Sequence, residues 1–228
     1  MEQALRRCLA ESEGDVAVVS HKGAIASLLG SREGLDYTAV TALHYEDGRL
    51  VSFERLGPPH PAMNDAVCLA LLNAAGAEKD RISHCRAVAR LADTLCKVLQ
   101  ERGLELGAKA VHRASLLHDI AKGLPNHAEV GGVWVKALGH AKLAEIVRQH
   151  TEPDGTELGE ATLVFYADKL MRGDRRSTLD ERFAASLEKC KTPEALAAHA
   201  RRRAAADAVQ NQIISLCGEE LLKQEGIL

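Results

Sequence analysis

The sequence predicts a mainly α-helical protein in which an all-helical domain follows a small α/β fragment. Aromatic residues make up only 3% of the 228 residues while Ala and Leu are plentiful, which favours helices packed by aliphatic side chains. Three prolines and a glycine meet in "RLGPPHPAMND", residues 55–65, and proline ends helices and cannot pair within a sheet. The apolar spacing is helical almost to the end after this stretch. We therefore expect a fragment over residues 1–57 and a helical domain over residues 63–228.

A strand, a helix and a hairpin are expected in the N-terminal fragment. The apolar run "DVAVVS", residues 15–20, is typical of a short buried strand, and "AIASLLG" reads as a helix closed by Gly30. In "VTALHYEDGRLVSFERL" two strand patterns flank Asp47-Gly48. A dipeptide of this kind between two strands is a strong hairpin signal.

The helical domain is expected to contain eight helices. Gly103, Gly123 and Gly139 stand where helix C-termini should end, because glycine readily adopts the left-handed conformation of a C-terminal cap. We expect the helices at about residues 63–75, 79–102, 108–122, 127–138, 141–151, 159–172, 178–189 and 193–216.

Charge and cysteine usage exclude several classes of function. The formal net charge of −3 offers no electrostatic case for nucleic acid as the main partner. No stretch of 18 apolar residues occurs, so we expect no membrane span. The N-terminus is charged without an apolar signal-peptide core, and the six cysteines form no C-x-x-C pair. These features predict reduced thiols in a cytoplasmic protein.

Two adjacent polar residues interrupt an apolar helical run. The stretch "ASLLHDIAKG", residues 114–123, places His118 beside Asp119. Burying an imidazole next to a carboxylate costs free energy unless each group finds a partner. The doublet therefore predicts that a partner for both groups lies at this point.

Three further segments place polar side chains on or beside apolar faces. His84 keeps the rhythm i, i+4, i+7, i+11 with apolar residues of "DRISHCRAVARLADTL". His150 ends the stripe of "LAEIVRQHTE", Asp168 shares an apolar face of "ATLVFYADKLM", and His127 opens the next helix in "PNHAEVGG". Taken alone, each histidine is typical of a satisfied core histidine, and Asp168 could pair with Lys169 or an arginine.

Together these residues predict a metal centre. Several independent buried polar groups in one small domain would cost much free energy, and a metal ion supplies a partner for all of them at once. Neutral imidazole and carboxylate are natural ligands of transition metals. One turn can offer His118 and Asp119 to a single ion, and a carboxylate can bridge two ions.

The four spaced elements resemble a known signature. His84, the doublet His118-Asp119 and Asp168 are similar to the H…HD…D pattern of the HD superfamily of metal-dependent phosphohydrolases. Four local sequence segments resemble that superfamily as well: "LLHDIAK", "HAEVG", "IVRQHTE" and "YADKL". The resemblance covers about residues 63–190. It implies an all-helical domain in which these four residues hold one metal ion.

The resemblance also bears on a second ion. His127 and His150 resemble the extra histidines of dinuclear members, in which the aspartate of the doublet bridges two ions. Thr151 stands where such members can carry a further ligand. We therefore expect one or two divalent transition-metal ions. A histidine-rich set favours iron, manganese or a similar metal, with magnesium as an alternative.

The activity implied is hydrolysis of a phosphoester or phosphoanhydride of a nucleotide or small phosphorylated metabolite by metal-activated water. We expect Asp119 and Lys122 to be catalytic, since Lys122 matches a lysine that faces the substrate phosphate in related members. The alternative is a solvated lysine at a helix C-terminus. Arg172 and Arg175 could hold a phosphate or simply end an exposed helix. A nucleotide-binding regulatory module without hydrolysis is the alternative function.

The N-terminal fragment carries a second resemblance. "VAVVSHKGAIASLLG" is similar to the late strand-turn-helix of histidine phosphatases, whose motif there is S-H-G-G. Ser20, His21 and Gly23 match, whereas Lys22 departs from the usual glycine. The match covers residues 1–57, the last third of such a domain.

The phosphoryl-accepting R-H-G element of histidine phosphatases would lie upstream of this match. This chain has no such element, and the covalent mechanism cannot run without its histidine. We expect a catalytically incomplete fragment. Because a small sheet has unpaired edges, we expect that the fragment packs on the helical domain, forms a homodimer or has lost an upstream partner through a misplaced start.

Overall fold

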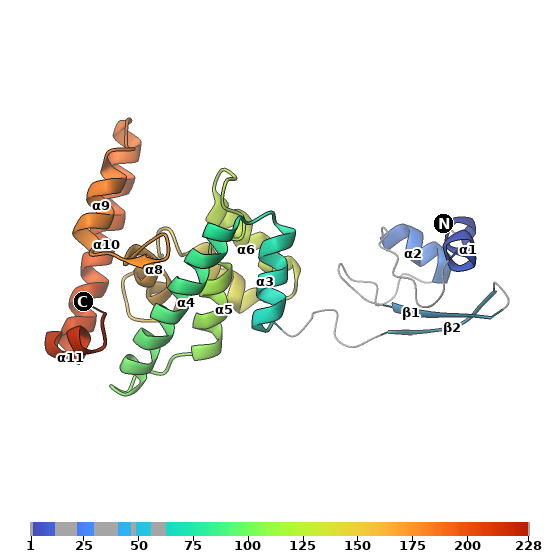
Figure 1. The fold of residues 1–228 in the computed structure, drawn as a ribbon, viewed down its shortest axis with the longest axis horizontal. Helices are drawn as coiled ribbons and strands as arrows, with labels where there is room; N and C mark the ends of the chain where they lie inside the picture. Colours follow the sequence, from blue (N-terminus) through green and yellow to red (C-terminus); the bar gives the residue numbers. More distant parts are fainter. Residues whose placement is uncertain (1, 12–21, 30–40, 47–48, 56–62, 228) are drawn as a thin grey trace. The chain divides into compact units, whose positions relative to one another are not determined.

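The computed structural model describes residues 2–11, 22–29, 41–46, 49–55 and 63–227 (Figure 1). The chain divides into two compact units, Met1–Pro61 and Ala62–Leu228. This division falls inside the proline-rich stretch of residues 55–65. Among the described residues, no helix combines the length and the apolar content needed to cross a membrane.

The first unit contains two helices and a hairpin. These are α1 (Glu2–Ala10), α2 (Lys22–Leu29), β1 (Thr41–Glu46) and β2 (Arg49–Arg55). The strands pair antiparallel with Glu46 opposite Arg49, which confirms the predicted hairpin, and α2 confirms the predicted helix. The helix α1 is not apparent from the apolar pattern, because Leu5 is the buried side chain among its described residues. The expected strand at residues 15–20 and His21 lie outside the described residues.

All eight helices expected in the second unit are present. They are α3 (Asp65–Ala74), α4 (Lys79–Gln100), α5 (Ala108–Leu117), α6 (His127–Ala137), α7 (Ala141–Arg148), α8 (Glu160–Lys169), α9 (Leu179–Leu187) and α10 (Pro193–Cys217). Gly103, Gly123 and Gly139 have φ angles of 89°, 103° and 84°, so each adopts the left-handed conformation that was predicted for it. A short helix α11 (Glu219–Gln224) was not predicted.

Three helices end three or more residues earlier than the sequence predicts, and one of them is α7, which was expected to reach residue 151 and ends at Arg148. The helix expected over residues 108–122 ends at Leu117, and tighter turns follow in which Lys122 N–H donates to the Asp119 carbonyl at 3.0 Å. Such i→i+3 hydrogen bonds wind the backbone into turns that are tighter than those of an α-helix. The helix expected over residues 159–172 ends at Lys169. A small hairpin of β3 (Met171–Arg172) and β4 (Arg175–Arg176) then turns at Gly173, whose φ is +62°.

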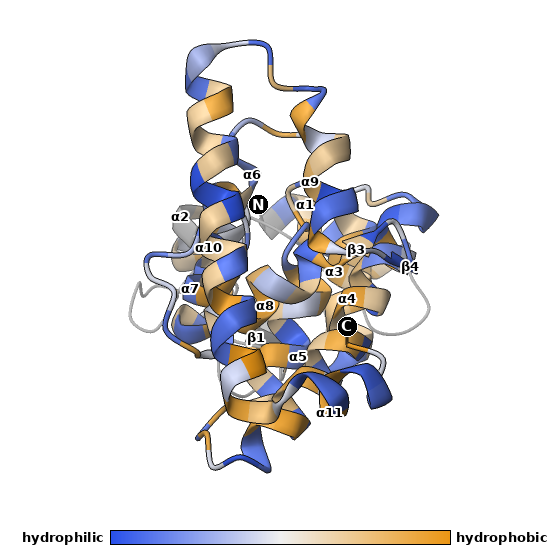
Figure 2. Cartoon of the chain, turned by 90° about the vertical axis from the view of Figure 1, so that its left-hand side faces the viewer, coloured by the Kyte–Doolittle hydropathy of each residue, from blue (hydrophilic) through white to orange (hydrophobic). Residues whose placement is uncertain are grey.

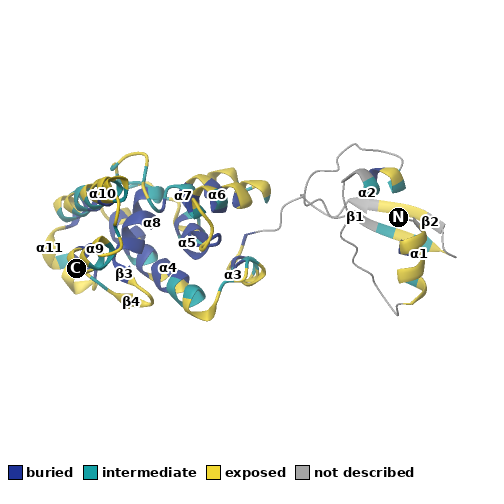
Figure 3. Cartoon of the chain, turned by 90° about the horizontal axis from the view of Figure 1, so that it is seen from above, coloured by how far each residue is buried: buried dark blue, intermediate teal, exposed yellow. Residues whose placement is uncertain are grey.

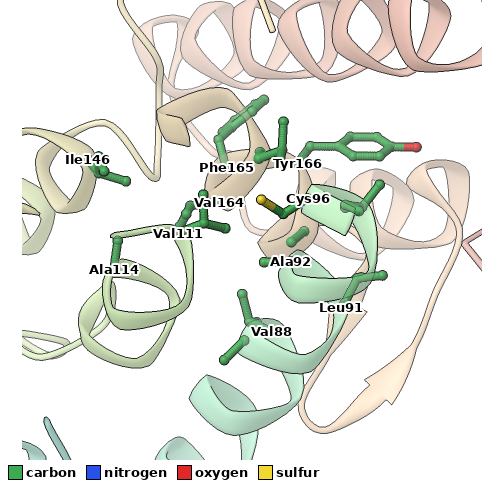
Figure 4. Close-up of a cluster of buried hydrophobic side chains, with 14 of the residues drawn as sticks. Val88, Leu91, Ala92, Cys96, Val111, Ala114, Ile146, Val164, Phe165 and Tyr166 are labelled. Carbon is green, nitrogen blue, oxygen red and sulfur yellow. The ribbon is translucent and has the colours of Figure 1, made fainter. Parts of the chain in front are cut away.

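The core of the second unit surrounds α8. Residues 162–169 of this helix are all buried, and Figure 3 shows α8 as a dark element beside the inner faces of α4 and α5. In Figure 4, Val88 of α4, Val111 of α5 and Val164 of α8 gather in one apolar cluster. A helix that is buried all round carries any polar residue into the core. This arrangement brings Asp168 to the centre of the domain.

The helix α9 is fixed by its cap and by α10. The Thr178 side chain accepts a hydrogen bond from Glu181 N–H at 3.2 Å, and the Glu181 carboxylate accepts one from Thr178 N–H at 3.1 Å, which is a capping box. His199 of α10 donates to the Phe183 carbonyl at 3.0 Å. Both helices mix hydrophilic and apolar residues along their length (Figure 2), as expected for helices at the edge of a core.

His112 links three helices, and we expect its contribution to stability to depend on pH. Its ring nitrogens donate to Asp93 at 2.8 Å and to Asp65 at 3.2 Å. Burial lowers the pKa of His112, but the two carboxylates raise that pKa above its usual value by a larger amount. The stabilisation is therefore complete below the unfolded-state pKa, about 6.5, and is lost as pH rises through the raised folded-state pKa.

Replacing His112 with Gln should accordingly lower the free energy of unfolding at about pH 5.5 by up to about 1 kcal/mol, because partly exposed ion pairs contribute little. At about pH 9 the variant and the wild type should differ less, since the wild-type imidazole has lost its charge. Urea unfolding at both pH values measures this. An equal difference at both values would show that the charge of His112 is irrelevant.

Candidate metal centre

The first group of converging ligand atoms comes from α4, the turn after α5, and α8. The Nε2 atoms of His84 and His118 lie 3.2 Å apart. The Oδ1 atom of Asp168 lies 3.1 Å from His84 Nε2 and 3.6 Å from His118 Nε2. His118 is fully buried and His84 is 14% exposed. Three residues that are far apart in the sequence therefore aim one atom each at a common point.

The second group comes from the same turn, the start of α6 and the turn after α7. The Nε2 atoms of His127 and His150 also lie 3.2 Å apart. Each lies 3.4 Å from the Oδ1 atom of Asp119. Within each of the two groups, the ligand atoms fall within 4.8 Å of one another.

Backbone carbonyls fix the protonation of three of these histidines. The Nδ1 atoms of His84, His118 and His150 lie 2.7 Å from the carbonyl oxygens of Gly173, Ser115 and Val147 respectively. A carbonyl oxygen can only accept a hydrogen bond, so each Nδ1 carries the proton. The Nε2 atom of a neutral ring then presents a lone pair, which is the arrangement of a metal-binding histidine.

This donor set fits a metal ion. The lone pairs of two imidazoles and a carboxylate oxygen face one another in the first group, and they repel unless a metal ion or a proton lies between them. Ligand atoms about 2.1 Å from an ion are themselves about 3.0–3.4 Å apart in octahedral or tetrahedral geometry, which agrees with the 3.1 and 3.2 Å separations. The second group repeats the pattern. Imidazole and carboxylate together suit a divalent transition metal.

Asp119 faces both groups with different oxygens. Its Oδ1 lies 3.4 Å from His127 and His150, whereas its Oδ2 lies 3.7 Å from His118 Nε2 and 3.9 Å from His84 Nε2. A carboxylate placed in this way can bridge two ions. The order His118-Asp119 in the tight turn after Leu117 therefore lets neighbouring residues serve both groups.

Electrostatics favour positive charge between these residues. Burial lowers the pKa of His150 to about 4, so its imidazole is neutral near pH 7. Burial would raise the pKa of Asp119, but His118, His127 and His150 hold it well below its usual range, so the carboxylate is ionised. Burial lowers the pKa of His118, but Asp119, Cys85 and Asp168 together raise that pKa well above its usual value. Two buried carboxylates thus attract a cation to this point.

Comparison with known proteins gives a family. The family model of the HD domain matches residues 81–211, more than half of the chain. The chain belongs to the HD domain family. This is a family of metal-dependent phosphohydrolases, and its match overlaps most of the range of residues 63–190 predicted from the motifs.

Two relatives are similar to part of the chain. An uncharacterised protein of Methanocaldococcus jannaschii is 30% identical over 120 residues, which cover 44% of this chain and 71% of the relative. Ribonuclease Y of Thermus thermophilus is 34% identical over 109 residues, which cover 44% of this chain and 18% of that protein. The chain thus spans less than a fifth of Ribonuclease Y. No solved structure is significantly similar to the chain.

Two lysines contact the two carboxylates of the candidate metal centre, Asp119 and Asp168. Lys122 Nζ lies 3.1 Å from Asp119 Oδ2, and its side chain is 49% exposed. Lys169 is buried, and its Nζ donates to Asp168 Oδ2 at 2.6 Å and to the His150 carbonyl at 3.2 Å. Lys169 therefore leaves Oδ1 of Asp168 to face the histidines. The pair between Asp168 and Lys169, which the sequence suggested as an alternative to a metal role, is present and uses Oδ2 of Asp168.

A cavity of about 430 Å³ opens beside the HD centre. His84, Asp119 and Lys122 line it together with Arg172, one of the two arginines that the sequence offered for phosphate. Arg175, the other, is not among the residues that line it. Further charged lining residues were not predicted: Arg81, Arg182, Glu188 and Lys189. No spacing in the sequence distinguishes these from ordinary exposed charges, because helix contacts bring them together.

Proposed function

We propose that this HD domain hydrolyses a phosphoester or phosphoanhydride of a nucleotide or another small phosphorylated metabolite. The observation that carries the proposal is that the centre contains two pairs of histidines whose Nε2 atoms lie 3.2 Å apart. Oδ2 of Asp119 faces one pair and Oδ1 faces the other. We propose His84, His118 and Asp168 as ligands of one ion, His127 and His150 as ligands of a second, and Asp119 as the bridge. All six lie in the unit Ala62–Leu228.

Bound divalent transition-metal ions supply an activated water nucleophile at neutral pH and polarisation of a phosphoryl oxygen. The residues of the chain do the rest. His84, His118 and His150 are held in one tautomer by backbone carbonyls, so their orientation needs no adjustment during turnover. Lys122, at the cavity beside Asp119, can neutralise charge that develops on the transferred phosphoryl group.

The family and one relative support this class of reaction. The HD domain is a family of metal-dependent phosphohydrolases, and a similar region occurs in a protein named as a ribonuclease, which favours a phosphoester bond. Because the net charge of this chain is −3, we propose a small phosphorylated substrate in preference to a nucleic acid.

Metal analysis followed by a hydrolysis screen tests the proposal. Protein purified without chelator should contain one to two equivalents of transition metal by mass spectrometry. It should hydrolyse bis(p-nitrophenyl) phosphate, p-nitrophenyl phosphate or members of a nucleotide panel, and EDTA should abolish that turnover until manganese or iron(II) is restored. Protein that contains no metal and takes none up would contradict the centre. Metal retention with nucleotide binding but no turnover would favour the regulatory module.

A further inference from the structure

The cavity beside the metal centre carries an excess of positive charge. Five cationic side chains line it, and the carboxylates that line it are those of Asp119 and Glu188. Lys122 is paired with Asp119. The other four cations make no ion pair or side-chain hydrogen bond within residues 63–227; they are Arg81, Arg172, Arg182 and Lys189. The charge of Arg172 also acts on the Glu181 carboxylate, and the remaining excess of cations gives the cavity a local field that favours anions.

Arg182 is the most constrained of these cations. Its Nε atom is buried and has no hydrogen-bond partner among the described residues. A buried donor without an acceptor costs free energy, and native proteins rarely leave one unpaired. Its backbone is held on α9 between Glu181, part of the capping box, and Phe183, which is bonded to α10. The side chain therefore starts from a rigid element and lines the cavity, while its buried Nε atom has no acceptor among the described residues.

The charge of the cavity exceeds what one phosphoryl group needs. In the function proposed above, the group that is cleaved lies at the metal centre, where the bound ions and Lys122 balance its charge. Arg182 comes from α9 and Lys189 from the turn that follows it, which form a different part of the same cavity. An arginine guanidinium presents a planar fork of donors that matches a phosphate bidentately.

We propose that Arg182 is a specificity-determining residue that binds a second anionic phosphate group of the substrate. This inference rests on the proposed function for the position of the first group. It narrows the substrate class to small molecules with two neighbouring phosphate groups, either a diphosphate or a bisphosphate. A monophosphate bound at the metal centre would leave Arg182 without a partner.

Two non-hydrolysable probes test the proposal by calorimetry on the purified metal-loaded protein. Methylenediphosphonate presents two neighbouring anionic groups and methylphosphonate presents one. The wild type should bind the first at least about tenfold more tightly, and R182Q should lose about tenfold of that affinity while its affinity for methylphosphonate changes less than about twofold. The control K191Q removes an exposed lysine that does not line the cavity and should bind both probes as the wild type does.

Several outcomes would overturn the proposal. Equal wild-type affinity for the two probes, no loss in R182Q, or an equal loss for both probes in R182Q each contradicts a second phosphate site at Arg182. The R182K variant keeps the charge but not the planar fork, so it should bind methylenediphosphonate with intermediate affinity. It also serves as the test variant if melting curves show that R182Q is unfolded.

The two proposals can fail separately. If the protein hydrolyses nothing but R182Q still loses affinity for methylenediphosphonate selectively, the phosphohydrolase proposal falls and the second phosphate site stands. If the protein turns over p-nitrophenyl phosphate while R182Q binds both probes as the wild type does, the hydrolase stands and this inference is wrong.

Discussion

Replacing Asp119 with Ala is expected to abolish both metal retention and hydrolysis. Oδ1 of Asp119 faces His127 and His150, and Oδ2 faces His84 and His118, so one substitution removes a ligand from both groups. Metal ions supply several kcal/mol of transition-state stabilisation, and their loss corresponds to a fall in turnover of about a thousandfold or more. Metal content by mass spectrometry and the rate of phosphoester hydrolysis measure the two effects.

A matched variant separates this effect from a general change in charge. Asp80→Asn removes an exposed carboxylate at the start of α4, and it should leave metal content and turnover unchanged. Without Asp119, Asp168 is the carboxylate that remains beside Lys122 and the four histidines of the two groups. This loss of negative charge could unfold the variant, so circular dichroism is used to check that Asp119→Ala is folded. A folded Asp119→Ala protein with full metal and full activity would show that the doublet is structural.

Much of the candidate site could be predicted from the sequence because its residues break a regular pattern. His84, His150 and Asp168 lie on or beside apolar stripes, and His118 is fully buried within an apolar run. A polar group on such a face must have a partner. The order of the motifs indicates the same residues through the resemblance to the HD superfamily. The family match over residues 81–211 includes all of these positions.

The division of the six residues into two groups could not be predicted in this way. It depends on where the helix before the doublet ends. The helix pattern continues to residue 122, but the backbone tightens after Leu117, and this turn allows Asp119 to face both groups. The charged cavity is hidden for a different reason. Arg81, Arg182 and Lys189 come from α4, α9 and the turn after α9, so only tertiary packing joins them.

Alanine substitutions of His127 and His150 should distinguish one-metal from two-metal chemistry. Both Nε2 atoms lie 3.4 Å from Asp119 Oδ1 and 3.2 Å from each other. They make no such contact with Asp168, which belongs to the other group. If they hold a second ion, either substitution should halve the metal content and cut turnover strongly, while the ion held by His84, His118 and Asp168 stays.

The opposite substitution sharpens this test. His84→Ala should also lower metal content, because it removes a ligand of the first group. The ion that stays is then the one held by Asp119, His127 and His150. His140→Ala, a histidine outside both groups, should change neither metal content nor turnover. If His127 and His150 instead contact the substrate phosphate, their alanine variants should keep full metal content and show a raised KM. Full metal content together with an unchanged kcat and KM in both variants would refute both roles. The neutral, buried imidazole of His150 would then be a core histidine held by its bond to the Val147 carbonyl.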